Sequence, residues 1–99
     1  MRRTGRSPTT RRRACAAFHS AALAPLRRRI GAIESKVGKL SARIRDIDAA
    51  LSAPDLYARD PTQAAALAKE RAERTALLSA AEDEWLSLNA AYEEAIAAE

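Results

Sequence analysis

Few residues of this chain have the types and spacing that catalysis needs. Cys15 and His19 flank Phe18, but no third partner stands near them to complete an activated nucleophile. A single cysteine excludes an internal disulfide, and a single histidine leaves no cluster of metal ligands. The consecutive carboxylates at 82–84 are typical of a solvated run. The sequence therefore predicts no enzyme, no metal site and no cofactor.

Arginine and lysine offer the clearest chemistry, because their cations can neutralise phosphates whatever the base sequence. The candidates for nucleic-acid binding are Arg27, Arg28, Arg29, Lys36, Lys39, Arg43 and Arg45. Arg29, Lys36 and Arg43 recur every seven residues and line one flank of a predicted helix. The alternative is that Arg29 and Arg43 pair with acids of a second helix. The freer groups would then be Arg28, Lys36, Lys39 and Arg45. Base-specific readout is not expected, since backbone contacts carry little sequence information.

The net charge of +4 is divided between two regions. Residues 1–30 hold nine arginines and no acid, whereas residues 31–99 hold eight basic and thirteen acidic side chains. Residues 1–13 have no hydrophobic pattern, so this segment is predicted to be disordered. Three interpretations of this basic arm stay open: a tether for nucleic acid, a solvated tail or an upstream frame artefact, and a targeting segment.

A seam of aliphatic residues at alternating steps of three and four organises the chain between Leu23 and Leu51. It consists of Leu23, Leu26, Ile30, Ile33, Val37, Leu40, Ile44, Ile47 and Leu51. This spacing predicts a helix with a narrow apolar stripe that needs a partner helix to bury it. The helix is expected to start near Pro25, which a first turn tolerates, with an extension back toward Ser20 as the alternative. It is expected to end by Ala53, because Pro54 disfavours helix at the residue before it.

A second helix supplies the partner. Its start signal is Asp60 as the cap, Pro61 at the first helical position and Gln63 for a capping box. The seam spacing continues in this helix at Leu67, Arg71, Arg74, Leu78, Ala81, Trp85, Leu88, Tyr92 and Ala95. A connector of seven residues makes the two helices antiparallel neighbours.

The expected fold is all-α, because only four aromatic residues and three glycines give little support to strands, while abundant alanine favours helix. A chain of 99 residues allows one small domain at most. We predict a two-helix antiparallel coiled-coil hairpin at residues 22–99, preceded by the disordered basic arm at 1–21. Within the hairpin we expect a helix at about 24–53, a connector at 54–60 and a helix at about 61–98.

Charge patterning favours one of two registers for this hairpin. In the first, paired seam residues have numbers that sum to 111. Its flanking ion pairs would be Arg43–Glu70, Arg29–Glu84 and Arg27–Glu82. In the second, the sum is 118; this register pairs Lys36 with Glu84 but sets Glu34 against Glu82. We expect the first register, although it places Arg71 and Arg74 beside aliphatic residues.

The aromatic residues are expected to be structural. Trp85 and Tyr92 could stack on bases, but their seam spacing is more typical of core residues. Tyr57 lies in the connector and is a better exposed candidate for stacking, although its expected role is to close the tip of the hairpin against Leu56.

Three features together carry a resemblance to a known family: the heptad helix, the connector Pro54-Asp55-Leu56-Tyr57-Ala58-Arg59-Asp60-Pro61, and an alanine-rich helix with Trp85-Leu86-Ser87-Leu88. Over about residues 26–93 they resemble the C-terminal domain of the Uup-type ABC-F ATPases. The resemblance implies an antiparallel coiled-coil hairpin that binds DNA. This chain departs from the family pattern at Arg71 and Arg74, where the family usually has leucines.

The ATP-binding cassettes that precede this domain in the family are absent from the sequence. A phosphate-binding loop needs the pattern G-x-x-x-x-G-K-[ST]. The nearest approach runs from Gly31 to Gly38-Lys39-Leu40, with the wrong spacing and no hydroxyl. ATP hydrolysis is therefore not expected, and the chain is interpreted as a detached domain, a gene remnant, or the partner of an ATPase encoded elsewhere.

Two functions from different classes stay open. The first is a non-catalytic DNA-binding coiled-coil module that contacts phosphates without strong sequence preference. The second is a protein–protein interaction module, or a truncated ABC-F remnant with no independent activity. Expected partners are nucleic acid, with DNA favoured, and an ABC-F ATPase or a second copy of the chain, but no membrane and no small-molecule substrate. No stretch approaches the ~18 apolar residues of a membrane span, so a cytoplasmic location is expected.

Overall fold

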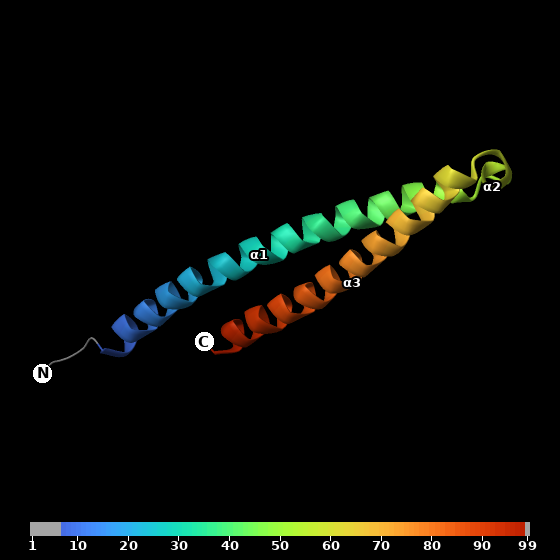
Figure 1. The fold of residues 1–99 in the computed structure, drawn as a ribbon. Coiled ribbons are helices and arrows are strands. Elements are labelled where there is room, and N and C mark those ends of the chain that lie inside the picture. The colour runs from blue at the N-terminus through green and yellow to red at the C-terminus, as the bar shows by residue number, and fades with distance from the viewer. Residues whose placement is uncertain (1–6, 99) are drawn as a thin grey trace, which may run out of the picture.

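The architecture is a long helical hairpin. The computed structural model describes residues 7–98, with side chains for residue 21 and for residues 23–98. Its elements are α1 (Ser7–Leu51), α2 (Leu56–Arg59) and α3 (Pro61–Ala97). The two long helices run antiparallel, with the single turn of α2 at the closed end (Figure 1). No strand occurs within residues 7–98, in agreement with the all-α prediction.

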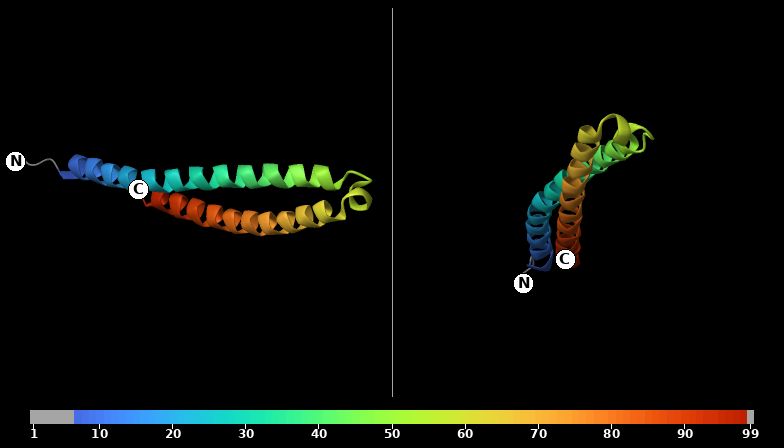
Figure 2. Two further views of the ribbon diagram at one scale, coloured as in Figure 1. Left: turned by 45° about the horizontal axis from the view of Figure 1, so that its top comes forward. Right: turned by 45° about the vertical axis from the view of Figure 1, so that its right-hand side comes forward.

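Helix α1 begins much earlier than expected. The sequence suggested a start near residue 24 after a disordered arm at 1–21, whereas α1 begins at Ser7 and passes through Pro25. Alanine and arginine are the commonest residues of this segment, and both favour helix, so it can extend an existing helix without an apolar pattern. The expected boundary is therefore corrected to Ser7, and residues 1–6 lie outside the described residues. Figure 2 shows α1 continuing beyond the end of α3.

The aliphatic seam of α1 packs against α3 as predicted. Only some layers of the seam are buried. These layers are formed by Leu23, Ile33, Leu40 and Ile47 of α1 and by Leu67, Ala81 and Leu88 of α3. The other aliphatic seam residues of α1 are only half-buried, because one partner helix covers a single stripe. The core is consequently narrow, and it runs along the hairpin as a line of single residues.

The closed end of the hairpin contains its best-buried cluster. Ile47 and Ala64 are fully buried there, together with Leu56 and Leu67. Leu56 comes from α2, so the short helix places an apolar side chain over the end of the seam. Tyr57, expected to share this role, is 58% exposed and points out of the cluster. The expectation for Tyr57 was wrong because the turn of α2 puts consecutive side chains on different faces.

The start of α3 follows its sequence signal. The Asp60 carboxylate accepts the Gln63 backbone N–H at 3.0 Å, and Pro61 occupies the first helical turn. The cap satisfies a backbone donor that would otherwise have no partner within the helix. The predicted helix at about 61–98 agrees with α3, which ends at Ala97.

The register differs from the expected one. Three hydrogen-bonded pairs join α1 to α3 with numbers that all sum to 119, namely Arg27–Tyr92, Glu34–Trp85 and Asp48–Arg71. A constant sum means a constant axial offset, and it agrees with the register of 118. The prediction of 111 was wrong.

Charge in the seam explains this outcome. The observed register gives the Arg71 guanidinium a carboxylate partner, Asp48, whereas the other register sets Arg71 beside Leu40. A charged group next to apolar surface is costly when it has no partner. The ion pairs that favoured 111 flank the seam, and a pair of this kind contributes well under ~1 kcal/mol where it is exposed. Of those pairs only Arg43–Glu70 forms among the described residues, where its two long side chains span the axial offset of the observed register.

Candidate nucleic-acid interface

Charge is divided unequally between the two long helices. From residue 23 to residue 51, α1 carries seven basic and three acidic side chains. Helix α3 carries three basic and seven acidic side chains. The two sides of the hairpin therefore have opposite sign, and a polyanion is attracted to the α1 side.

Five of the seven candidate cations share one flank of α1. Successive helical residues are about 100° apart, which places these five within a sector of about 100°. They are Arg28, Arg29, Lys36, Lys39 and Arg43, and we refer to them as the basic flank. The flank extends over about 23 Å of helix. All but Arg43 are exposed, and none of these four exposed cations forms an ion pair with a described residue.

Arg43 is engaged by α3 instead. Its Nε and Nη2 each donate a hydrogen bond to the Glu70 carboxylate, both at 2.7 Å. This bidentate contact raises the pKa of Arg43, and the side chain is half-buried. Arg43 thus joins the two helices. This agrees with the alternative stated above, in which Arg43 pairs with an acid of the second helix instead of binding phosphate.

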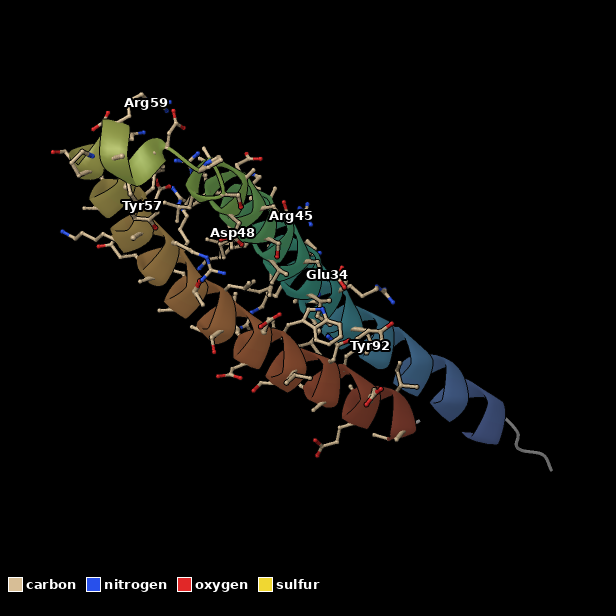
Figure 3. The ribbon with its side chains drawn as sticks, turned by 90° about the vertical axis from the view of Figure 1, so that its right-hand side faces the viewer. Glu34, Arg45, Asp48, Tyr57, Arg59 and Tyr92 are labelled. Carbon is tan, nitrogen blue, oxygen red and sulfur yellow. The ribbon has the colours of Figure 1, made fainter. Side chains whose placement is uncertain are left out.

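Arg27 and Arg45 lie away from the basic flank. Each is at least about 100° around α1 from every member of the flank. Arg27 Nη1 donates to the Tyr92 hydroxyl at 3.3 Å. In Figure 3 Arg45 points away from α3, while Asp48 lies between the helices. The structure therefore does not bring all seven candidates to one surface.

The two seam arginines of α3 both have acidic partners. Arg71 donates from Nε and Nη2 to Asp48, which lowers the pKa of that carboxyl. Arg74 Nε donates to Glu70 at 2.6 Å. Hydrogen bonds from Arg43 and Arg74 together lower the pKa of Glu70 to about 2. Arg71 therefore joins α3 to α1, whereas Arg74 is paired within α3, and both guanidinium groups are already engaged by carboxylates.

Trp85 is held at the seam by a contact that sequence reasoning missed. Its Nε1 donates to Glu34 Oε2 at 3.0 Å, and the indole is half-buried. These two residues line a cavity of about 260 Å³ together with Val37 and Glu82. Figure 3 shows Glu34 in the space between the helices. Two carboxylates beside the indole repel phosphate, so Trp85 is unsuited to stacking on nucleic-acid bases.

Metal-binding and membrane-spanning features are not found among the described residues. No group of three or more His, Cys, Asp or Glu side chains in this part of the chain is placed to hold a metal ion. The side chains of Cys15 and His19 lie outside it. Within residues 7–98, no helix combines the length and apolar character that crossing a bilayer requires.

Comparison with known proteins confirms the family resemblance. Residues 25–90, two thirds of the chain, match the family described as ABC transporter C-terminal domain. No curated protein and no solved structure matches the chain. The matched region contains the seam, the connector with α2 and the Trp85 end of α3, and it corresponds to the C-terminal domain of ABC-F type proteins. The chain belongs to the ABC transporter C-terminal domain family.

Proposed function

We propose that this chain is a non-catalytic coiled-coil module that binds DNA through phosphate contacts, without strong sequence preference. The observation that carries the proposal is the basic flank. Four of its cations, Arg28, Arg29, Lys36 and Lys39, are exposed and form no ion pair within the described residues. Their charge is therefore available to an external polyanion.

The dimensions of the flank suit a nucleic-acid backbone. From Arg28 to Lys39 the helix rises about 17 Å. Phosphates of one DNA strand are spaced by about 3.4 Å along the duplex axis, so this length faces about five of them. Four cations at this spacing can each neutralise one phosphate. Contacts of this kind orient the duplex but do not read its bases.

The salt dependence of binding tests the mechanism. Anisotropy of a labelled 20-base-pair duplex would be measured with the full chain from about 50 to 300 mM salt. Each neutralised phosphate contributes about −0.9 to the slope of log K against log salt, so four contribute about −3.6. The double variant Arg28→Gln/Lys39→Gln is expected to make the slope less negative by about 1.8.

A matched control separates the basic flank from net charge. The variant Arg45→Gln/Lys69→Gln removes the same charge from exposed positions elsewhere on the hairpin. We expect it to change the slope by less than half as much. An equal change in both variants would show that overall charge or the N-terminal arginines cause binding. Absence of DNA binding at 50 mM salt would refute the proposal and favour a remnant or a protein-binding module.

A further inference from the structure

We propose that the cavity beside Trp85 binds an arginine side chain from a partner protein. The cavity opens between the two long helices and has a volume of about 260 Å³. Glu34 and Val37 line it from α1, and Glu82 and Trp85 line it from α3. Neither the family match nor the proposed DNA contact assigns a role to this site, and the proposal is independent of both.

The lining selects for a cation. Glu34 and Glu82 bring two carboxylates to one small cavity, and neither forms an ion pair with any residue in the described part of the chain. Glu34 accepts only the neutral Trp85 N–H among the hydrogen bonds found there. A cation in the cavity would be attracted to both carboxylates and would lie close to the indole, where its attraction to the ring adds to that of the acids.

The size and shape of the cavity favour a single planar group. Pockets that hold drug-sized ligands or cofactors start at about 300 Å³, slightly above this volume. A guanidinium is flat, so it can stack on the indole while its N–H groups donate to a carboxylate, and its aliphatic stem suits Val37. A lysine ammonium provides a point charge without the stacking face. Arginine is consequently the side chain that uses every part of the lining.

The occupant must come from another molecule. The arginines of this chain that precede the hairpin are at Arg13 and earlier positions. Because α1 is continuous from Ser7, Arg13 lies about 31 Å along the helix from Glu34. Ser7 itself is about 40 Å away, and the few residues before it span at most about 20 Å even when fully extended. An arginine-rich segment of a partner protein is therefore required.

Trp85 reports directly on the site, because it is the only tryptophan of the chain. A synthetic peptide with the sequence of residues 1–13 provides six arginines and no tryptophan. Titrating it into the full-length protein is expected to change the Trp85 emission saturably. The peptide with every arginine replaced by glutamine is expected to leave the emission unchanged. A peptide with lysine in place of arginine is expected to bind at least threefold more weakly.

Two protein variants locate the binding. Glu34→Gln/Glu82→Gln is expected to weaken peptide binding at least fivefold. Glu93→Gln/Glu94→Gln removes the same charge from exposed positions nearer the end of α3 and is expected to change the affinity less than twofold. Circular dichroism checks that each variant is as helical as the parent. Equal losses in both variants, equal affinity for the lysine peptide, or no saturable response up to millimolar peptide would each overturn the proposal.

Discussion

Replacing Ile47 by alanine should destabilise the hairpin more than truncating any exposed leucine. Ile47 is fully buried, and it packs in the cluster that joins α1, α2 and α3 at the closed end. Its neighbours there, Leu56, Ala64 and Leu67, come from two other helices. Helices of this length are held together by such packing rather than by propensity alone. Loss of this side chain therefore weakens the link between all three helices.

The size of the effect follows from the atoms removed. Ile47→Ala deletes three carbons, each worth about 0.8 kcal/mol of burial, which gives about 2.4 kcal/mol. The cavity left behind adds to this, so we expect a loss of 2–5 kcal/mol in the free energy of unfolding. For a domain of this size 1 kcal/mol corresponds to about 4–8 °C in melting temperature. A decrease of at least about 8 °C, and up to about 40 °C at the upper end of this range, is the expected result.

Urea titration followed by circular dichroism at 222 nm would measure the change. Leu86→Ala is the matched control, because Leu86 is 60% exposed on α3 and its truncation leaves no cavity. Its effect should stay within about 0.5 kcal/mol. A loss below about 1 kcal/mol for Ile47→Ala, or a loss no larger than that of the control, would refute the assignment of the closed end as the centre of stability.

Three further predictions concern single sites. Asp60→Ala removes the cap of α3 and should cost about 1 kcal/mol in urea titrations, whereas Asp60→Asn should cost far less. Glu70 has a folded-state pKa of about 2, below its unfolded value of about 4.3, so its contribution is complete above pH 4.5 and is lost as the pH falls towards 2. The Glu70→Gln variant should thus melt at a lower temperature than the parent at pH 7 and at the same temperature near pH 2; a gap independent of pH would contradict this. At Gly31 and Gly38 an added methyl group meets nothing within 4 Å, so alanine at each should raise stability by about 0.5–1 kcal/mol, and destabilisation would show an unseen contact.

Much of the fold could be predicted because its determinants are local. The seam spacing from Leu23 to Leu51 specifies which face of α1 is apolar, and a helix with one apolar face has few alternatives. The start of α3 depended on Asp60 and Pro61, whose effects reach only one turn. The start of α1 was predicted too late for two reasons. Alanine and arginine form helix without a periodic apolar signal. Pro25 suggested the first turn of the helix, whereas α1 passes through it.

The candidate interface was predictable in composition but not in arrangement. The sequence identified all seven cations, and helical geometry groups five of them on one flank. Which cations are free depends on where α3 places its acids. Arg43 is held by Glu70 and Arg27 by Tyr92, and both contacts join residues distant in the chain. The site at Trp85 was missed for the same reason, since Glu34 and Glu82 reach one cavity only through the packing of the two helices.

The sequence by itself determined that this chain folds as two antiparallel helices joined at a proline-bounded connector, because periodicity, caps and breakers act within a few residues. Tertiary structure alone decided the register. Shifting one helix along the other by one heptad changes few apolar contacts. The ion-pair partners of a few charged side chains therefore decide which register has the lower free energy. Asp48 provides a partner for Arg71 in one register and not in the other. The same choice brings Glu34 to Trp85, and it thereby decides which cations and which acids of the hairpin remain available to partners.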